Sequence, residues 1–309
     1  MNYWSKIKEL FHKKPKIIVV LGQTSSGKTD IAINLAHSHN AEIISADSRQ
    51  VYRGLDLGSG KVTKKEMKGV PHYMLDVADP REVYSVAQFQ EAGTKHIKDI
   101  LDRGKTPIIC GGTGQYIDAL VHQSSFPAVA PNYEIRRQRE LQTTDLLYSE
   151  LMRRDPARAK SIDQHNKVRL QRALEIVDAR GSVPALNTKS RYDVLYIGLK
   201  LDQDILYKRI LGRITDRLDQ GMLQEARSLQ QKGLSYERMD QLGLEYRFMA
   251  KHLKNELNSD GLISGLNIAT RQFAKRQMTW FKRNKDINWF NPIDQRVDIF
   301  DTVVNFLKK

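Results

Sequence analysis

The segment "KIIVVLGQTSSGKTDIAINLAHSH", residues 16–39, constrains the fold of this chain more than any other part of the sequence. Its apolar run at 17–21 predicts a buried strand, and the apolar spacing after residue 28 predicts a helix. Between them stands the pattern Gly22-x-x-x-x-Gly27-Lys28-Thr29, a phosphate loop in the strand–loop–helix context that this motif requires. In such a loop, backbone N–H groups surround phosphates, the lysine supplies positive charge and the threonine hydroxyl can ligate Mg²⁺. We therefore predict a site for a chain of phosphates, with Mg²⁺ on Thr29, formed by Gly22, Thr24, Ser25, Ser26, Gly27, Lys28 and Thr29.

Strands and helices alternate along much of the remaining chain. Further strands are expected at 42–45, 106–110 and 193–201, and helices at about 86–102 and from about 204. This alternation predicts an α/β fold, a doubly wound parallel sheet of the P-loop NTPase type, whose ligands lie beyond the carboxyl ends of the strands.

The sequence changes character in its middle third. From about residue 122 no convincing strand is found, and arginine-rich, charged helices follow the stretch "FPAVAPN". We therefore predict an all-helical insertion at 122–190, between a first part of the core at 1–121 and a second part, with C-terminal helices, at 191–309.

Two polar stretches follow predicted strands. Asp47, Ser48 and Gln50 come after the strand at 42–45, and Thr113 belongs to "GGTGQY" after the strand at 106–110. Asp47 has two interpretations. It could hold Mg²⁺, as the strand-end aspartate of many ATPases does, or it could accept a proton from a base edge. The residues by themselves leave both roles open.

Composition narrows the possible partners. Lys and Arg outnumber Asp and Glu by 50 to 36, for a formal net charge of +14, which favours a polyanionic partner such as nucleic acid, although a basic surface can also serve solubility alone. Cys110 is the only cysteine, which excludes internal disulfides and cysteine-rich zinc sites.

No apolar run is long enough to span a membrane, so we expect a cytoplasmic protein without a membrane partner. The segment 1–14 is expected to form a short helix packed on the core, with a membrane surface as the alternative.

Seven motifs together resemble a known family. In chain order they are "GQTSSGKT", "ADSRQVYRGLDLGSGK", "PHYMLDVADP", "YSVAQF", "GGTGQYIDAL", "NKVRLQRALEI" and "TRQFAKRQMTWFKR". This order is similar to that of the tRNA dimethylallyltransferases, over about residues 16 to 283. The resemblance implies that the loop holds the diphosphate of dimethylallyl diphosphate, and that the allyl group passes to N6 of the adenosine beside the tRNA anticodon.

The resemblance also implies roles for individual residues. Asp47 would be the general base, Thr113 would orient the adenine amine and Arg217 would bind the diphosphate. The anticodon stem-loop would be contacted by Asp47, Ser48, Arg49, Gln50, Thr113, Arg136, Arg169 and Arg172, the last three belonging to the helical insertion. Arg169 and Arg172 stand three residues apart, which places them on one helix face. We expect the protein to act as a monomer.

The chain departs from the family pattern at four places. Gln23 stands where the family has proline, and "SGKV" at 59–62 replaces "TAKP". The segment "RLDQGMLQEA" is shortened, and "LGLEYRF" replaces a "GYKE"-like motif.

The rival functions are transfer of the same group to a free adenylate, small-molecule phosphorylation, and an ATP-dependent switch that binds nucleic acid. The arginine-bearing insertion argues against a free nucleotide as substrate, because a free nucleotide does not need such a surface.

Overall fold

The computed structural model describes residues 14–122, 127, 129, 132–184 and 189–309. It divides the chain into two compact units, one formed by residues 1–122 with 190–309 and the other by residues 123–189. The predicted insertion differs from the second unit by one residue at each end. The predicted N-terminal helix lies outside the described residues, as does most of the "FPAVAPN" stretch.

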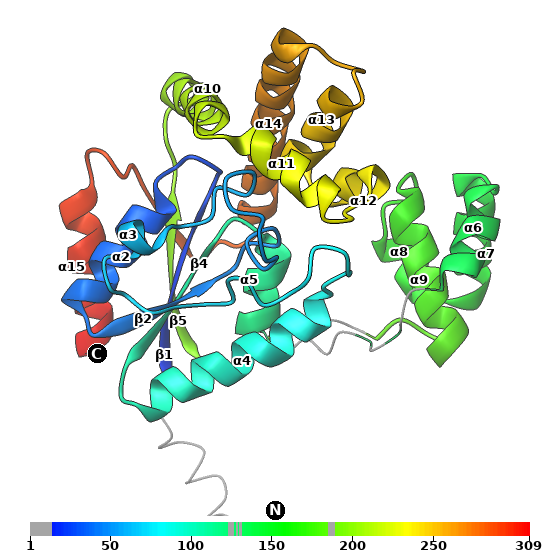
Figure 1. Cartoon of the computed structure of the whole chain (residues 1–309). Coiled ribbons are helices and arrows are strands. Elements are labelled where there is room, and N and C mark those ends of the chain that lie inside the picture. Colours follow the sequence, from blue (N-terminus) through cyan, green and yellow to red (C-terminus); the bar gives the residue numbers. More distant parts are fainter. Residues whose placement is uncertain (1–13, 123–126, 128, 130–131, 185–188) are drawn as a thin grey trace, which may run out of the picture. The chain divides into compact units, whose positions relative to one another are not determined.

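The described strands of the first unit form one six-stranded sheet in which all pairs are parallel (Figure 1). The order across the sheet is β3-β2-β4-β1-β5-β6. The predicted α/β fold with a doubly wound parallel sheet is therefore confirmed. The strands are β1 Lys16–Gly22, β2 Ala41–Ser45, β3 His72–Tyr73, β4 Thr106–Gly111, β5 Asp193–Leu199 and β6 Ile287–Phe290.

Both faces of the sheet are covered, as the continuous apolar runs of its strands require. On β1, Val19 and Leu21 pack into one hydrophobic core with α4 and α5, while Ile18 and Val20 pack into a second core with α2 and α15. The first core also receives residues from α10, α11, α13 and α14. Figure 1 shows these four helices near the edge of the sheet where the strands end.

The helices of this unit are α2 Lys28–Ser38, α3 Lys64–Met67, α4 Val86–Asp102, α5 Gly114–Val121, α10 Gln203–Asp219, α11 Met222–Gln231, α12 Tyr236–Gln241, α13 Leu244–Leu253, α14 Ser259–Phe281 and α15 Arg296–Lys308. The predicted helix at 86–102 is confirmed, and its start is explained by Ser85, which forms a capping box with Gln88. The short strands β3 and β6 were not predicted. Neither "HY" nor "INWF" is long enough to show a period, so their pairing with β2 and β5 depends on the assembled sheet.

The second unit contains helices and no strand in the part that the structure describes. Its helices are α6 Tyr133–Glu140, α7 Thr144–Arg154, α8 Pro156–Ser161 and α9 Lys167–Arg180. They enclose a small core of their own, in which Leu147 and Leu151 of α7 pack with Leu170 and Leu174 of α9. Among all described helices of the chain, none combines the length and the apolar character needed to cross a bilayer.

Candidate active site

The phosphate loop joins β1 to α2 and has the backbone that its sequence predicts. Gly27 adopts a left-handed conformation, φ 92°, immediately before the first residue of α2, and Ser25 is also left-handed at φ 61°. Glycine accepts this conformation without the steric cost that a side chain brings. The turn thus brings the loop to the amino terminus of α2, where backbone N–H groups favour an anion.

The loop forms one wall of a pocket at the carboxyl ends of the central strands. Of the predicted phosphate-binding residues, Thr24, Ser25, Lys28 and Thr29 line this pocket. Gly22, Ser26 and Gly27 do not line it and complete the loop from behind. Asp47 and Gln50 also line the pocket, and further lining comes from Ser45, Ser59, Gly60, Cys110 and Arg213. One pocket therefore unites the predicted phosphate site with the predicted base.

Lys28 has an unusual electrostatic environment. Its ammonium group turns into the protein and donates a hydrogen bond to the Gln23 carbonyl at 2.6 Å. Burial of the ammonium lowers the pKa of Lys28 to about 8, an effect that nearby Cys110 and Asp47 oppose and Arg213 reinforces. An anion in the pocket would raise the pKa of Lys28 again, since an opposite charge favours the protonated lysine.

Asp47 lies in the turn after β2 and is held by the backbone. Its Oδ1 accepts hydrogen bonds from the N–H groups of Arg49 at 2.8 Å and Gln50 at 3.4 Å. Its Oδ2 accepts none from the described residues, which leaves one carboxylate oxygen available to a ligand. Thr113 does not line the pocket but lies beside the same turn, where its Oγ1 accepts the N–H of Ser48 at 3.1 Å. The two predicted catalytic residues thus belong to adjoining, hydrogen-bonded loops.

The structure separates two arginines of α10. Arg213 lines the pocket, whereas Arg217 does not. Arg217 donates to the carbonyls of Leu57 at 3.1 Å and Gly58 at 3.2 Å, and lies 3.7 Å from Glu245. The role predicted for Arg217 on the diphosphate stays a prediction. Arg213 is the candidate that sequence reasoning missed, although its position one turn earlier on the same predicted helix was a signal for it.

Glu225 of α11 fixes the loop that contributes Ser59 and Gly60. Its carboxylate accepts three backbone N–H groups, from Asp56, Leu57 and Gly58 at 2.8–3.0 Å, and the hydroxyl of Tyr246 at 2.6 Å. Together with Arg217 on the carbonyls of the same loop, it satisfies backbone groups that would otherwise need water. Sequence reasoning also missed Glu225, because nothing near it in the chain indicates the partner.

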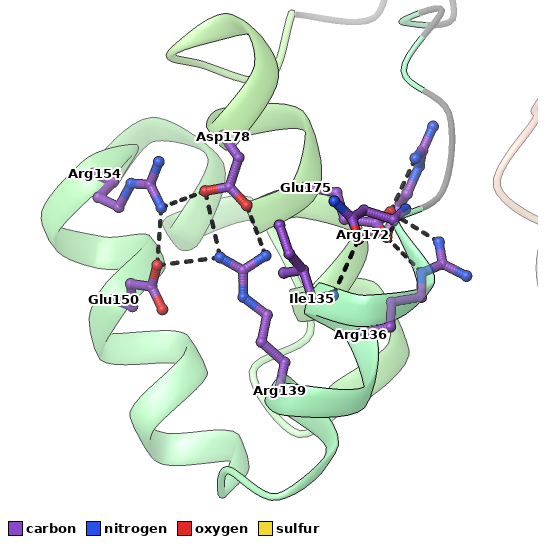
Figure 2. Close-up of polar contacts among 9 residues, drawn as sticks. Ile135, Arg136, Arg139, Glu150, Arg154, Arg172, Glu175 and Asp178 are labelled. Carbon is purple, nitrogen blue, oxygen red and sulfur yellow. Dashed lines mark hydrogen bonds and ion pairs between the residues drawn. The ribbon is translucent and has the colours of Figure 1, made fainter.

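The arginines predicted to contact RNA lie in the second unit, which is described by itself. The Glu175 side chain of α9 is buried, with 2% of its surface exposed, and it forms ion pairs with Arg136 at 2.6 Å and Arg172 at 3.0 Å (Figure 2). Arg172 also donates to the carbonyl of Val129 at 2.9 Å. Arg169, by contrast, is exposed, and its side chain makes no hydrogen bond or ion pair with the described residues.

A second ion network joins three helices of this unit. Arg139 and Arg154 both contact Glu150 and Asp178, at 2.7 to 3.3 Å (Figure 2). Arg139 has only 8% of its surface exposed, so these contacts connect α6, α7 and α9 and leave it little freedom to reach a ligand. The two networks explain why not every arginine of the insertion is available to an outside partner.

Two side chains of the pocket carry oxygen atoms that could hold Mg²⁺ if the ion arrived with phosphate. The described part of the chain has no cluster of three or more Asp, Glu, His or Cys side chains that could coordinate a metal ion by themselves. Mg²⁺ bound beside phosphates commonly takes only one or two protein oxygens, and the remaining ligands are phosphate and water. The Thr29 hydroxyl at the start of α2 and the Asp47 carboxylate, which line the same pocket, are oxygen groups of this kind.

Comparison with known proteins agrees with this geometry. A family model described as IPP transferase matches residues 50–284. The chain belongs to this family. A tRNA dimethylallyltransferase from Bacillus cereus is 38% identical over 292 residues, covering 91% of this chain and 92% of the relative. The resemblance drawn from the seven motifs is thereby confirmed.

Solved structures of the family share the fold. A full-length tRNA isopentenylpyrophosphate transferase from Bacillus halodurans superposes with a TM-score of 0.73 at 33% identity, covering 96% of this chain and 97% of that one. A eukaryotic dimethylallyltransferase acting on tRNA superposes with a TM-score of 0.78 at 28% identity, covering 90% of this chain and 74% of that one. The bacterial and the eukaryotic structure therefore share the fold of this chain.

Proposed function

We propose that this protein transfers the dimethylallyl group of dimethylallyl diphosphate to N6 of the adenosine adjacent to the anticodon, position 37 of tRNA, with release of diphosphate. The observation that carries the proposal is that the phosphate loop and Asp47 line one pocket. A leaving group and a proton acceptor are the two things that alkylation of an exocyclic amine requires. Membership of the IPP transferase family supports the same reaction.

Each side of the pocket has its part in the reaction. The loop amides, Lys28 and Arg213 hold the diphosphate and stabilise the negative charge that grows on it as the allylic C–O bond breaks. Mg²⁺ held through Thr29 would add to this stabilisation. The nitrogen of the adenine amine attacks the allylic carbon, and Asp47 accepts the proton that the amine loses, through its available Oδ2. Thr113, whose Oγ1 accepts the N–H of Ser48 beside Asp47, would help to orient the amine.

The base must leave the anticodon-loop stack to reach this pocket. Ser48, Arg49 and Gln50 follow Asp47 in the same turn and would contact the extruded nucleotide. The helical insertion would hold the RNA backbone. Of the three insertion arginines that the resemblance assigns to RNA, Arg169 is best suited to a phosphate, since it is exposed and makes no ion pair among the described residues. Arg136 and Arg172 would approach the RNA already paired with Glu175.

The test compares two labelled donors and two acceptors. The protein is incubated with dimethylallyl diphosphate labelled in the allyl group, and separately with ATP labelled in the γ-phosphate, each with an anticodon stem-loop or with AMP as acceptor. We expect label to move from the allylic donor to the stem-loop only. Hydrolysis of ATP at enzymatic rates would support a kinase or an ATP-dependent switch, and faster transfer to AMP would support a free-nucleotide prenyltransferase.

A further inference from the structure

Gln277 of α14 connects the phosphate loop with the loop that follows β4. Its side-chain Oε1 accepts the N–H of Thr24, in the phosphate loop, at 2.8 Å. Its Nε2 donates to the carbonyl of Gly112, next to Thr113, at 2.9 Å. Because one partner can only donate and the other can only accept, the two contacts fix the orientation of the amide. Gln277 is also buried, with 7% of its surface exposed, so water does not compete for these bonds.

The hydrogen bonds continue from Gly112 to the turn that holds Asp47, the proposed general base. The next residue, Thr113, donates its N–H to Ala46 at 3.1 Å and accepts the N–H of Ser48 on its Oγ1 at 3.1 Å. Ala46 and Ser48 are the two neighbours of Asp47 in the chain. A series of hydrogen bonds therefore runs from the phosphate loop, through Gln277 and the loop of Thr113, to the turn that holds Asp47.

The phosphate loop is attached to α14 at a second point. Gln23 Nε2 donates to the carbonyl of Ala274, one turn before Gln277, at 3.1 Å. Gly112 and the Gln277 side chain are also closely packed, because a Cβ atom added at Gly112 would lie 2.3 Å from Gln277 Nε2. Two glutamines thus hold the phosphate loop against a long helix, and the close approach of Gln277 to Gly112 leaves no room for a side chain at that position.

We propose that Gln277 is a positioning residue that sets the separation between the diphosphate and the attacking amine; this inference rests on the proposed function. Gln277 is not proposed to bind a substrate, since its side-chain oxygen and nitrogen are both hydrogen-bonded to backbone groups. Transfer requires the nitrogen and the allylic carbon to stand about 3–3.5 Å apart and in line, and a displacement of about 1 Å can cost about 10²-fold in rate. Gln277 holds the loop on the leaving-group side to the loop on the amine side.

The decisive variant is Gln277→Glu, which keeps the size and shape of the side chain. In its ionised form the carboxylate can still accept the Thr24 N–H but has no hydrogen for the Gly112 carbonyl, so the link to the amine side is lost and two acceptors oppose each other. The assay is therefore run over a pH range, because protonation of this carboxyl at lower pH restores the donor. The matched control is Gln272→Glu, an exposed glutamine on the same helix that receives the same change of charge.

The measurement separates positioning from affinity and from stability. In single turnovers at saturating dimethylallyl diphosphate and stem-loop, we expect Gln277→Glu to be slower than the parent by about tenfold or more. The Kd for dimethylallyl diphosphate should stay within about threefold of the parent value, and Gln272→Glu should match the parent in both. Diphosphate released per group transferred should rise above the parent ratio in Gln277→Glu, because a misplaced amine lets water compete.

Gln277→Leu, which removes both bonds, should show the same pattern if it folds. A parent-like single-turnover rate in Gln277→Glu, or a loss that saturating donor restores, would overturn the proposal. Failure of the parent to transfer the allyl group at all would instead refute the proposed function, so the two failures are distinguishable.

Discussion

Lys28 should make diphosphate binding depend on pH in a way that the structure specifies. In the unliganded protein, burial holds the pKa of this lysine near 8. A bound diphosphate restores an opposite charge next to the ammonium and raises its pKa toward the ordinary value of about 10.4. Because the complex then holds a proton that the free protein has partly lost, binding takes up protons, and affinity falls as the pH rises through about 8.

The size of the effect follows from the two pKa values. With a pKa near 8 in the free protein, about three-quarters of the lysine is neutral at pH ~8.5, so binding there should take up about three-quarters of a proton. Between pH ~7 and ~9 the Kd should rise about tenfold, or about 1.4 kcal/mol, through this group alone.

Calorimetry provides the assay. Titration of the parent with diphosphate in two buffers of different ionisation enthalpy gives the proton uptake at each pH, after correction for the ionisation of diphosphate itself. Lys28→Arg is the matched control, because arginine stays charged over this range and its corrected Kd should not vary. An uptake below about 0.2 protons at pH ~8.5, together with a corrected Kd that changes less than about threefold from pH ~7 to ~9, would refute the reasoning.

Three other predictions follow from the site and its surroundings. Asp47→Asn should slow single-turnover transfer by about 10²-fold or more with little change in diphosphate affinity; loss of Mg²⁺-dependent diphosphate affinity instead would make Asp47 a metal ligand. Arg169→Ala should reduce the slope of log K against log salt for stem-loop binding by about one unit, with saturated turnover unchanged, whereas an unchanged slope would count against a phosphate contact. Glu42, whose side chain is 1% exposed, pairs with Arg103 and Lys105, and these bonds hold its pKa at about 2. Glu42→Gln should therefore lower the free energy of unfolding by about 2 kcal/mol near neutral pH in urea titrations. That difference should shrink as the pH falls from 4.5 toward 2, and a pH-independent difference would contradict the assignment.

The sequence by itself determined the central strands, the phosphate loop and the family. The strands β1, β2, β4 and β5 are apolar runs with clear ends, and the loop is a contiguous motif whose conformation depends on its own glycines. The positions of Asp47 and Thr113 also followed, because the carboxyl ends of parallel strands meet at one edge of the sheet. Such features are local or follow from the rules of a parallel sheet, so a single sequence suffices to predict them.

Only the tertiary structure decided which side chains complete and support the pocket. Glu225 reaches backbone groups more than 160 residues earlier in the chain, and Gln277 reaches Gly112 across a separation of 165 residues. Arg213, not Arg217, lines the pocket because the rotation of α10 is set by its packing on the core. In the insertion, Glu175 forms ion pairs with Arg136 and Arg172, two of the arginines that the family resemblance predicts to contact RNA. Each of these outcomes depends on where a helix packs in the folded protein. The packing of distant apolar residues fixes that position, so it cannot be predicted from the local sequence pattern around each polar residue.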